Sequence, residues 1–224
     1  MNSVTYITPR TLKAKTAQWL REIEPFNYRK RSFRPRSGAL IVVDTQRFFI
    51  EKPYPLSCEN SRVILPRLRK LIAAFRRAGR PVLYVAQMHK GVDVDRGEQL
   101  SRWWPTPPLE GRPEVLIHPQ LAPRPGEKVI PKRRYSGFYA TDLDVTLRVM
   151  KVTDVVVCGV LTNVCVDCTA RDAFFRDYRV FLVADGTAAM DEGMHLAALR
   201  TAAGWYAKVV DTERICAACS ALKR

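Results

Sequence analysis

A cysteine at the start of a predicted helix is the residue of this chain best placed to act as a nucleophile. An apolar run at 154–160 ends in a short turn at 161–163, and Cys165 follows in the first turn of a segment with helical spacing. The first N–H groups of a helix have no acceptor within it, and the helix dipole is positive at that end. This position is predicted to bias the Cys165 thiol toward the thiolate and to offer N–H groups that hold a developing oxyanion.

A carboxylate follows the first apolar run of the chain. Residues 39–43 are all apolar, and Asp44 comes directly after them. This pattern is typical of a buried strand in a parallel sheet, with Asp44 at the carboxyl end, where open α/β sheets form their ligand crevice. The alternative is an aspartate that caps a turn or pairs with a surface arginine.

A lysine is placed in a similar way, because Lys132 ends a short apolar piece at 129–131 and precedes a helix-like run near Thr141. A lysine in a basic tract is usually solvated, and Cys165 alone could be a small core residue, since free cysteine is often buried. Together, however, the three segments supply a thiol, a carboxylate and an ammonium at strand ends. A thiol needs a base to take its proton, and a nearby cation stabilises the thiolate.

These three residues, in this order and in their surrounding motifs, resemble the isochorismatase-like cysteine hydrolases. The family strand motif, Asp-x-Gln-x-x-Phe, is matched by Asp44, Gln46 and Phe49. The lysine segment, Lys-x-Arg-x-Ser-x-Phe, is matched at 132–138, and the cysteine segment, Gly-x-x-Thr-Asn-x-Cys-Val-x-x-Thr-x-Arg-Asp-Ala, at 159–173. The resemblance covers roughly residues 38 to 210.

The resemblance implies a cysteine hydrolase that cleaves a C–N bond of a small amide or ureido compound through a thioester, with no cofactor. The wording of the cysteine segment looks closest to ureidoacrylate, biuret and N-carbamoylsarcosine amidohydrolases. The residues assigned to the site are the catalytic Asp44, Lys132 and Cys165, the oxyanion-binding N–H groups of Leu161 and Cys165, a cis peptide between Val160 and Leu161, and a substrate pocket formed by Gln46, Phe49, Trp103, Arg134 and Tyr135. Arg134 is predicted either to bind a carboxylate of the substrate or to form a structural ion pair.

Departures from the family pattern separate this chain from two of its branches. The metal-binding Asp-x-His of nicotinamidases corresponds here to Gln87 and His89, and the chain has only 3 His. Because a metal site needs several converging ligands, we predict catalysis without a metal. Isochorismatases proper lack the nucleophilic cysteine, so Cys165 also disfavours that activity. The remaining alternative is a non-catalytic or redox-sensing relative with a reactive thiol.

The elements that must position these residues alternate between strand and helix, which predicts a three-layer α/β/α fold with an open parallel sheet. Residues 1–37 are predicted to be an N-terminal helical and basic extension, and residues 38–224 the hydrolase domain. Residues 87–127 are rich in Pro and are predicted to be a long irregular insertion. The expected helices lie at about 8–25, 60–78, 141–150, from Cys165 to 177, and 191–205, and the expected strands at about 39–44, 82–86, 154–159, 179–185 and 207–211.

Composition sets the class of protein. The 224 residues suit one main domain, and 47% hydrophobic residues with a mean hydropathy of −0.17 favour a soluble globular protein. No apolar run approaches the ~20 residues that span a membrane, no secretory signal is visible, and 6 Cys at irregular spacing do not indicate a disulfide framework. A cytoplasmic enzyme is therefore expected. Cys168 is either a redox partner of Cys165 or packed nearby, and Cys216 and Cys219 are either half of a metal site or a packed or exposed helix end.

The net charge of +15 is unusual for this kind of enzyme. No nucleic-acid recognition motif accompanies it, so solvated faces and attraction of an anionic substrate explain the charge better than a nucleic-acid partner. An apolar stripe around Trp19 and the Trp103-Trp104 pair offer surface that a monomer would expose. The protein is therefore predicted to be a homo-oligomer, a dimer or tetramer.

Overall fold

A computed structural model describes residues 3–222 and contains one sheet of six parallel strands in the order β3-β2-β1-β4-β5-β6. The two central strands, β1 and β4, are buried along their whole length because both of their faces are covered by helices. The strands are β1 (Gly38–Val43), β2 (Val82–Gln87), β3 (Lys128–Lys132), β4 (Asp154–Val160), β5 (Arg179–Ala188) and β6 (Lys208–Val210). This topology confirms the predicted α/β fold.

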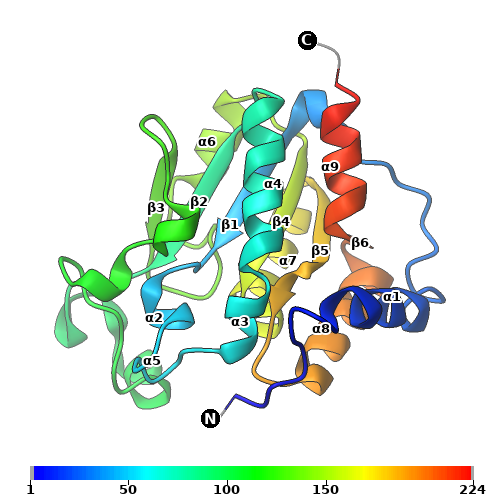
Figure 1. Cartoon of the computed structure of the whole chain (residues 1–224). Coiled ribbons are helices and arrows are strands. Elements are labelled where there is room, and N and C mark those ends of the chain that lie inside the picture. The colour runs from blue at the N-terminus through cyan, green and yellow to red at the C-terminus, as the bar shows by residue number, and fades with distance from the viewer. Residues whose placement is uncertain (1–2, 223–224) are drawn as a thin grey trace.

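Helices cover both faces of this sheet (Figure 1), with α4 and α9 on one face and α6 and α7 on the other. The crossovers bring the carboxyl ends of β1, β3 and β4 to one edge of the sheet. The helices are α1 (Leu12–Glu22), α2 (Arg47–Ile50), α3 (Glu59–Val63), α4 (Leu65–Arg77), α5 (Glu98–Trp103), α6 (Leu143–Val149), α7 (Asp167–Phe175), α8 (Glu192–Trp205) and α9 (Thr212–Ser220). None of the helices in the described part of the chain is both long and apolar enough to cross a membrane.

Some expected elements differ in detail. The helix expected at 60–78 is divided into α3 and α4, and Pro66 lies in the first turn of α4, where its missing N–H costs no helical hydrogen bond. The insertion at 87–127 contains α5 and several single turns. Helix α2 was not expected, and α9 was anticipated only as the helix end that was one interpretation of Cys216 and Cys219. Both are short, and short helices leave a weak periodic signal in a sequence.

The N-terminal extension packs against its own chain, which corrects the expectation that its apolar stripe lies open for a partner. Leu12, Trp19 and Ile23 belong to the buried core, with 4%, 0% and 0% of their surface exposed. In Figure 1, α1 lies beside α8 at one end of the sheet. The surface offered by Trp19 therefore cannot form a subunit contact in this arrangement.

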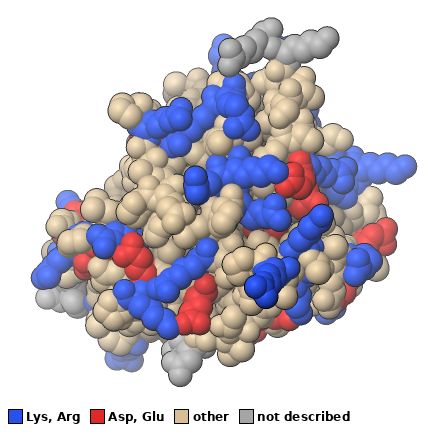
Figure 2. Space-filling model, in the orientation of Figure 1, with Lys and Arg blue, Asp and Glu red and all other residues tan. Residues whose placement is uncertain are grey.

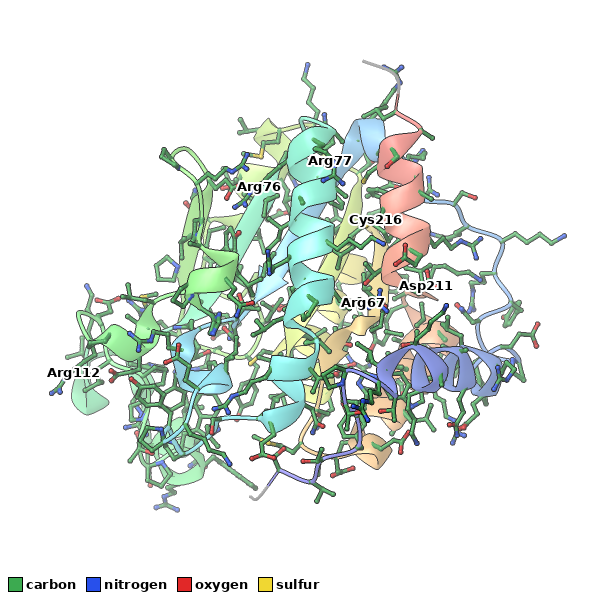
Figure 3. The ribbon with its side chains drawn as sticks, viewed as in Figure 1. Arg67, Arg76, Arg77, Arg112, Asp211 and Cys216 are labelled. Atoms are coloured by element: carbon green, nitrogen blue, oxygen red, sulfur yellow. The ribbon has the colours of Figure 1, made fainter. Side chains whose placement is uncertain are left out.

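The positive charge is prominent on the face formed by α4 and α9. Figure 2 shows many Lys and Arg and fewer Asp and Glu on this face, and Figure 3 shows Arg67, Arg76 and Arg77 projecting from α4. Arg67 pairs with Glu213 and Arg76 with Glu127. These partly exposed pairs support the interpretation of the charge as largely solvated surface.

Candidate active site

Asp44 lies directly beyond β1, at the edge where the predicted residues meet. Its backbone has the left-handed φ of +48°, a conformation that aspartate tolerates better than most residues. Its N–H donates to the carbonyl of Val85 at 2.9 Å, and its Oδ1 accepts from the N–H of Gln87 at 2.9 Å. Asp44 has 0% of its surface exposed, so these bonds to β2 fix a carboxylate within the protein.

Lys132 ends β3 and forms a buried ion pair with Asp44. Its Nζ lies 2.9 Å from Oδ2 of Asp44 and donates to Oε1 of Gln87 at 2.7 Å and to the carbonyl of Arg134 at 3.1 Å. The contact with Oδ2 lies outside hydrogen-bonding geometry, so this oxygen keeps lone pairs for another donor. Burial disfavours the charged lysine, but Asp44 and Cys165 outweigh it and raise the pKa of Lys132.

Cys165 completes the cluster, since its thiol lies close enough to Asp44 and Lys132 for both side chains to shift its pKa. Burial and the Asp44 carboxylate raise the pKa of this thiol well above its usual value, and Lys132 opposes them. The expected bias toward the thiolate is therefore wrong for the resting site. The geometry instead favours a neutral thiol beside an aspartate–lysine ion pair, with the open lone pairs of Asp44 as the proton acceptor.

The turn between β4 and Cys165 has the backbone that the resemblance implied. The Val160–Leu161 peptide is cis, and residues Thr162–Val166 form a π-helical turn that leads into α7. The carbonyl of Leu161 accepts from the N–H groups of Val164 and Val166 at 3.1 and 3.2 Å. The N–H of Leu161 donates to no backbone or side-chain acceptor among residues 3–222, so it is available to an oxyanion near the Cys165 sulfur.

Gly159 allows β4 to approach β1 closely just before this turn. Its φ is +113°, and a Cβ at this position would lie 2.0 Å from the carbonyl oxygen of Val43. The register between β4 and β5 also shifts between Val157 and Gly159. Only glycine has both the backbone freedom and the size that this approach requires.

Gln87 links the cluster to a second buried group. Because its Oε1 accepts from Lys132, its amide nitrogen faces His89, and the two side chains meet at 2.6 Å between Nε2 atoms. His89 then carries its proton on Nδ1, which lies 3.3 Å from Oδ1 of Asp95. Burial lowers the pKa of His89, so a neutral imidazole fits this chain of contacts from Asp95 to Lys132.

The aromatic side chains that pack together near the cluster differ from the predicted set, Phe49, Trp103 and Tyr135, at one position. Trp103 is 79% exposed, whereas the adjacent Trp104 packs against Phe49 at 6.0 Å and Tyr135 at 5.8 Å between ring centroids. Tyr135 in turn is close enough to Cys165 for the thiolate charge to raise its pKa, after burial as the larger cause. The assignment of Trp103 to the pocket is therefore corrected to Trp104.

Arg134 is directed away from the cluster. Its guanidinium donates to the carbonyls of Asp95 and Arg133 at 3.0 and 2.7 Å, and it lines a cavity of about 710 Å³ whose wall includes none of the three predicted catalytic residues.

Sequence reasoning missed a second arginine, Arg96, which is 2% exposed. It donates to the carbonyl of Trp104, and its Nε has no acceptor among the residues and side chains that the structure describes. Arg96 is therefore a buried cation beside Trp104.

Gln46 has a supporting position. Its amide nitrogen donates to the carbonyls of Gln87 and Val115, each at 2.9 Å, and so ties the end of β2 to the insertion. Its Oε1 is buried without a protein donor. Gln46 therefore mainly holds the end of β2 against the insertion, and Oε1 is the side-chain atom that remains for a ligand.

The structure also shows the surroundings of Cys168, Cys216 and Cys219. Cys216 and Cys219 are buried, and Cys216 Sγ lies 3.8 Å from the carbonyl of Lys70 in α4 (Figure 3). This is the packed helix end that the sequence left as one of two options. Cys168 is partly exposed. Among the side chains that the structure describes, no three His, Cys, Asp or Glu residues cluster as a metal site would require.

Comparisons with known proteins identify the family of this chain. Residues 38–214 match the isochorismatase domain family. The chain is 35% identical over 204 residues to the ureidoacrylate amidohydrolase RutB of Methylobacterium radiotolerans, covering 80% of this chain and 79% of the relative. It is 32% identical to nicotinamidase 3 of Arabidopsis thaliana, covering 85% and 92% of the two chains. The crystal structure of a cysteine hydrolase from Pseudomonas syringae superposes with a TM-score of 0.83 at 30% identity, covering 87% of this chain and 97% of that one.

Proposed function

Because this chain belongs to the isochorismatase domain family of hydrolases, we propose that it is a cysteine amidohydrolase that cleaves a C–N bond of a small amide or ureido compound. The observation that carries the proposal is the buried Asp44–Lys132 pair, 2.9 Å apart, which lies close enough to Cys165 for both charges to act on its thiol. A thiol, a base and a cation in contact are the parts that nucleophilic catalysis by cysteine needs. The RutB relative supports a ureido substrate.

The first half of the reaction forms a thioester. Asp44 accepts the thiol proton through its open Oδ2 while the sulfur attacks the substrate carbonyl carbon. The carbonyl electron pair moves to oxygen, and the N–H groups of Leu161 and Cys165 hold the resulting oxyanion. The tetrahedral intermediate then collapses, the C–N bond breaks, and the leaving amine or ammonia takes the proton from Asp44. Lys132 keeps its charge throughout and offsets the negative charge of the sulfur.

The second half regenerates the enzyme. Water enters where the amine left, Asp44 takes one of its protons, and the oxygen attacks the thioester carbonyl. The same two N–H groups hold the second oxyanion. When the C–S bond breaks, the sulfur recovers the proton from Asp44, and the carboxylic or carbamic acid leaves. One carboxylate therefore serves as base and then acid in each half.

We extend the proposal to an anionic substrate held by Arg96 rather than Arg134. Arg96 is buried, has an unused Nε and lies against Trp104, whereas both described contacts of Arg134 Nη1 are protein carbonyls. A guanidinium binds a carboxylate through two parallel hydrogen bonds. Arg96→Met should raise KM for carboxylate-bearing ureides by about tenfold or more and leave neutral amides less affected. Arg134→Met is the matched control and should raise KM less.

The test of the activity is ammonia release from a panel of ureides, carboxylate-bearing amides and nicotinamide. Wild-type protein should hydrolyse at least one ureide, and Cys165→Ala should abolish the reaction while circular dichroism stays unchanged. A covalent adduct of the expected mass on Cys165 should accumulate when the reaction is quenched early. Full activity in Cys165→Ala would end the assignment, and preference for nicotinamide would move the protein to the nicotinamidase branch.

The prediction that no metal takes part is tested separately. Exhaustive chelation followed by gel filtration should leave hydrolysis unchanged, because Gln87 already donates to His89 and accepts from Lys132. Activity that disappears on chelation and returns with zinc or iron would contradict this prediction. A gel shift at near-physiological salt should show no nucleic-acid binding.

A further inference from the structure

A buried histidine connects the N-terminal extension to the turn that follows β4. His195 of α8 has 0% of its surface exposed. Its ring lies 4.4 Å from that of Trp19 and 5.8 Å from that of Tyr6, measured between centroids. Both aromatic residues lie outside the matched family domain, which begins at residue 38. The extension therefore covers a polar side chain of the hydrolase domain.

The covering aromatic ring is itself fixed. Nε1 of Trp19 donates to Oε1 of Glu192 at 2.8 Å, and Nζ of Lys15 lies 2.9 Å from both oxygens of the same carboxylate. Glu192 precedes His195 by one turn on α8. The extension and α8 are thus joined by hydrogen bonds as well as by ring packing.

On its other side, His195 contacts the candidate site. Its Nδ1 lies 2.9 Å from the hydroxyl of Thr162, which is fully buried and follows Leu161 directly. Burial lowers the pKa of His195 to about 3, so the imidazole is neutral at neutral pH and its contact with Thr162 is an ordinary hydrogen bond. Thr162 begins the π-helical turn that holds Cys165.

We propose that His195 is a positioning residue for the oxyanion turn and that the N-terminal extension contributes to catalysis through it. His195 holds the side chain of Thr162, and Thr162 directly follows Leu161, so this contact restrains the backbone that carries the Leu161 N–H. Trp19 holds His195 in place. This inference rests on the proposed function, because it assigns the support of the oxyanion-binding N–H groups and not the identity of the nucleophile.

The size of the effect follows from the geometry that an oxyanion site requires. Loss of one donor to an oxyanion typically costs about 10²–10³ in rate. His195 does not donate to the oxyanion, so its loss should misalign the donor rather than remove it. We therefore expect a loss of about 10- to 100-fold.

Two reactions of Cys165 separate this role from a general structural one. Acylation by p-nitrophenyl acetate passes through an oxyanion and releases a burst of nitrophenol, whereas alkylation by iodoacetamide forms no oxyanion. His195→Leu removes the contact with Thr162 and should slow the burst about 10- to 100-fold while alkylation stays within about twofold. His195→Asn keeps a polar atom near the position of Nδ1 and should recover most of the burst rate. Thr162→Val should match His195→Leu, and the double variant should lose no more, since both remove one hydrogen bond.

The extension is tested with Trp19→Leu, and Trp205→Leu on the same helix as His195 is its control, because Trp205 is 75% exposed. Only the Trp19 variant should slow acylation selectively. An unchanged burst rate in His195→Leu, or an equal loss of acylation and alkylation, would overturn the inference. Absence of a Cys165-dependent burst in the wild-type protein would instead overturn the proposed function.

Discussion

Two buried aspartates lie at opposite ends of the same pair of strands, and their carboxylates differ in the hydrogen bonds that they accept. Asp154 opens β4 opposite Gly38, and Asp44 follows Val43 at the far end of β1. Both carboxylates have 0% of their surface exposed and both are paired with a cation. Burial and ion pairing alone therefore do not distinguish a structural carboxylate from a reactive one.

The difference lies in how many donors fill the carboxylate lone pairs. Asp154 accepts from the backbone N–H, Nε and Nη2 of Arg34 and from the hydroxyl of Thr153, at 2.9 to 3.2 Å. Its cations are also partly exposed, 54% for Arg34 and 25% for Arg179. Asp44 has one directed hydrogen bond, to Oδ1, and a fully buried lysine beside Oδ2. A saturated carboxylate holds the chain in place, and an unsaturated one can take a proton.

The largest expected effect is on hydrolysis. Asp44→Asn should lower kcat/KM by about 10²–10⁴-fold, because it removes the proton acceptor. Asp154→Asn, the matched substitution at the other end of the strands, should change kcat/KM less than about threefold per folded molecule, which falls in the range of surface effects. Steady-state ammonia release measures both. Comparable losses in the two variants would mean that the carboxylates do not differ in role.

The second expected effect of Asp44→Asn is a faster alkylation of Cys165, in contrast to the slower hydrolysis. The Asp44 carboxylate helps to raise the pKa of Cys165, whereas Lys132 lowers it. Asp44→Asn should therefore shift the pH midpoint of Cys165 alkylation downward and speed alkylation at neutral pH by about tenfold, although hydrolysis is lost. Mass spectrometry after timed iodoacetamide exposure follows the reaction at Cys165. Asp154→Asn serves as the control with an unchanged midpoint, and a slower reaction in Asp44→Asn would contradict the assigned charges.

The third effect is on stability. Asp154→Asn leaves several donors of Arg34 and Thr153 less well satisfied and should lower the free energy of unfolding by about 1–3 kcal/mol. Urea denaturation followed by circular dichroism measures the loss. Arg34→Met should lose a similar amount, and the double variant should lose less than the sum. Full additivity would show that the hydrogen bonds between the two side chains contribute little.

The smallest effect is expected on assembly. Both aspartates are buried within one chain, so neither substitution should change the oligomeric state. We retain the prediction that the protein is at least a dimer, with the exposed Trp103 still available to a contact and Trp19 excluded by its burial. Light scattering at micromolar concentration decides this. A fully active wild-type monomer would refute the prediction.

The sequence predicted the sheet and the residues that meet at its edge because both depend on local patterns. Apolar runs that end in Asp44, Lys132 and a turn before Cys165 are visible without any tertiary information. Parallel strands then bring their carboxyl ends together, so the convergence follows from topology. The cis peptide before Leu161 was implied only by resemblance, since no residue pattern specifies it.

The features that were predicted wrongly or missed depend on side-chain packing, which a sequence pattern does not contain. The dipole argument predicted a thiolate at Cys165, but burial among other charged groups has the larger effect on its pKa. An apolar stripe around Trp19 shows that a face is covered, not which surface covers it. Trp103 and Trp104 are adjacent in a loop without regular period, and Arg96 lies in a polar stretch where nothing marks it as buried. Each error arose where side-chain environment, rather than strand order, decides the outcome.

The close approach at Gly159 has a consequence for how a mutational scan of this protein should be read. Any Cβ at this position would overlap the carbonyl of Val43, so every replacement must displace β1 or β4 beside the site. Position 159 should therefore tolerate substitution as poorly as position 165, although glycine contributes no reacting group. Intolerance at these two positions would look alike in a fitness map, and only the soluble yield of each variant would separate the position that shapes the enzyme from the one that performs its chemistry.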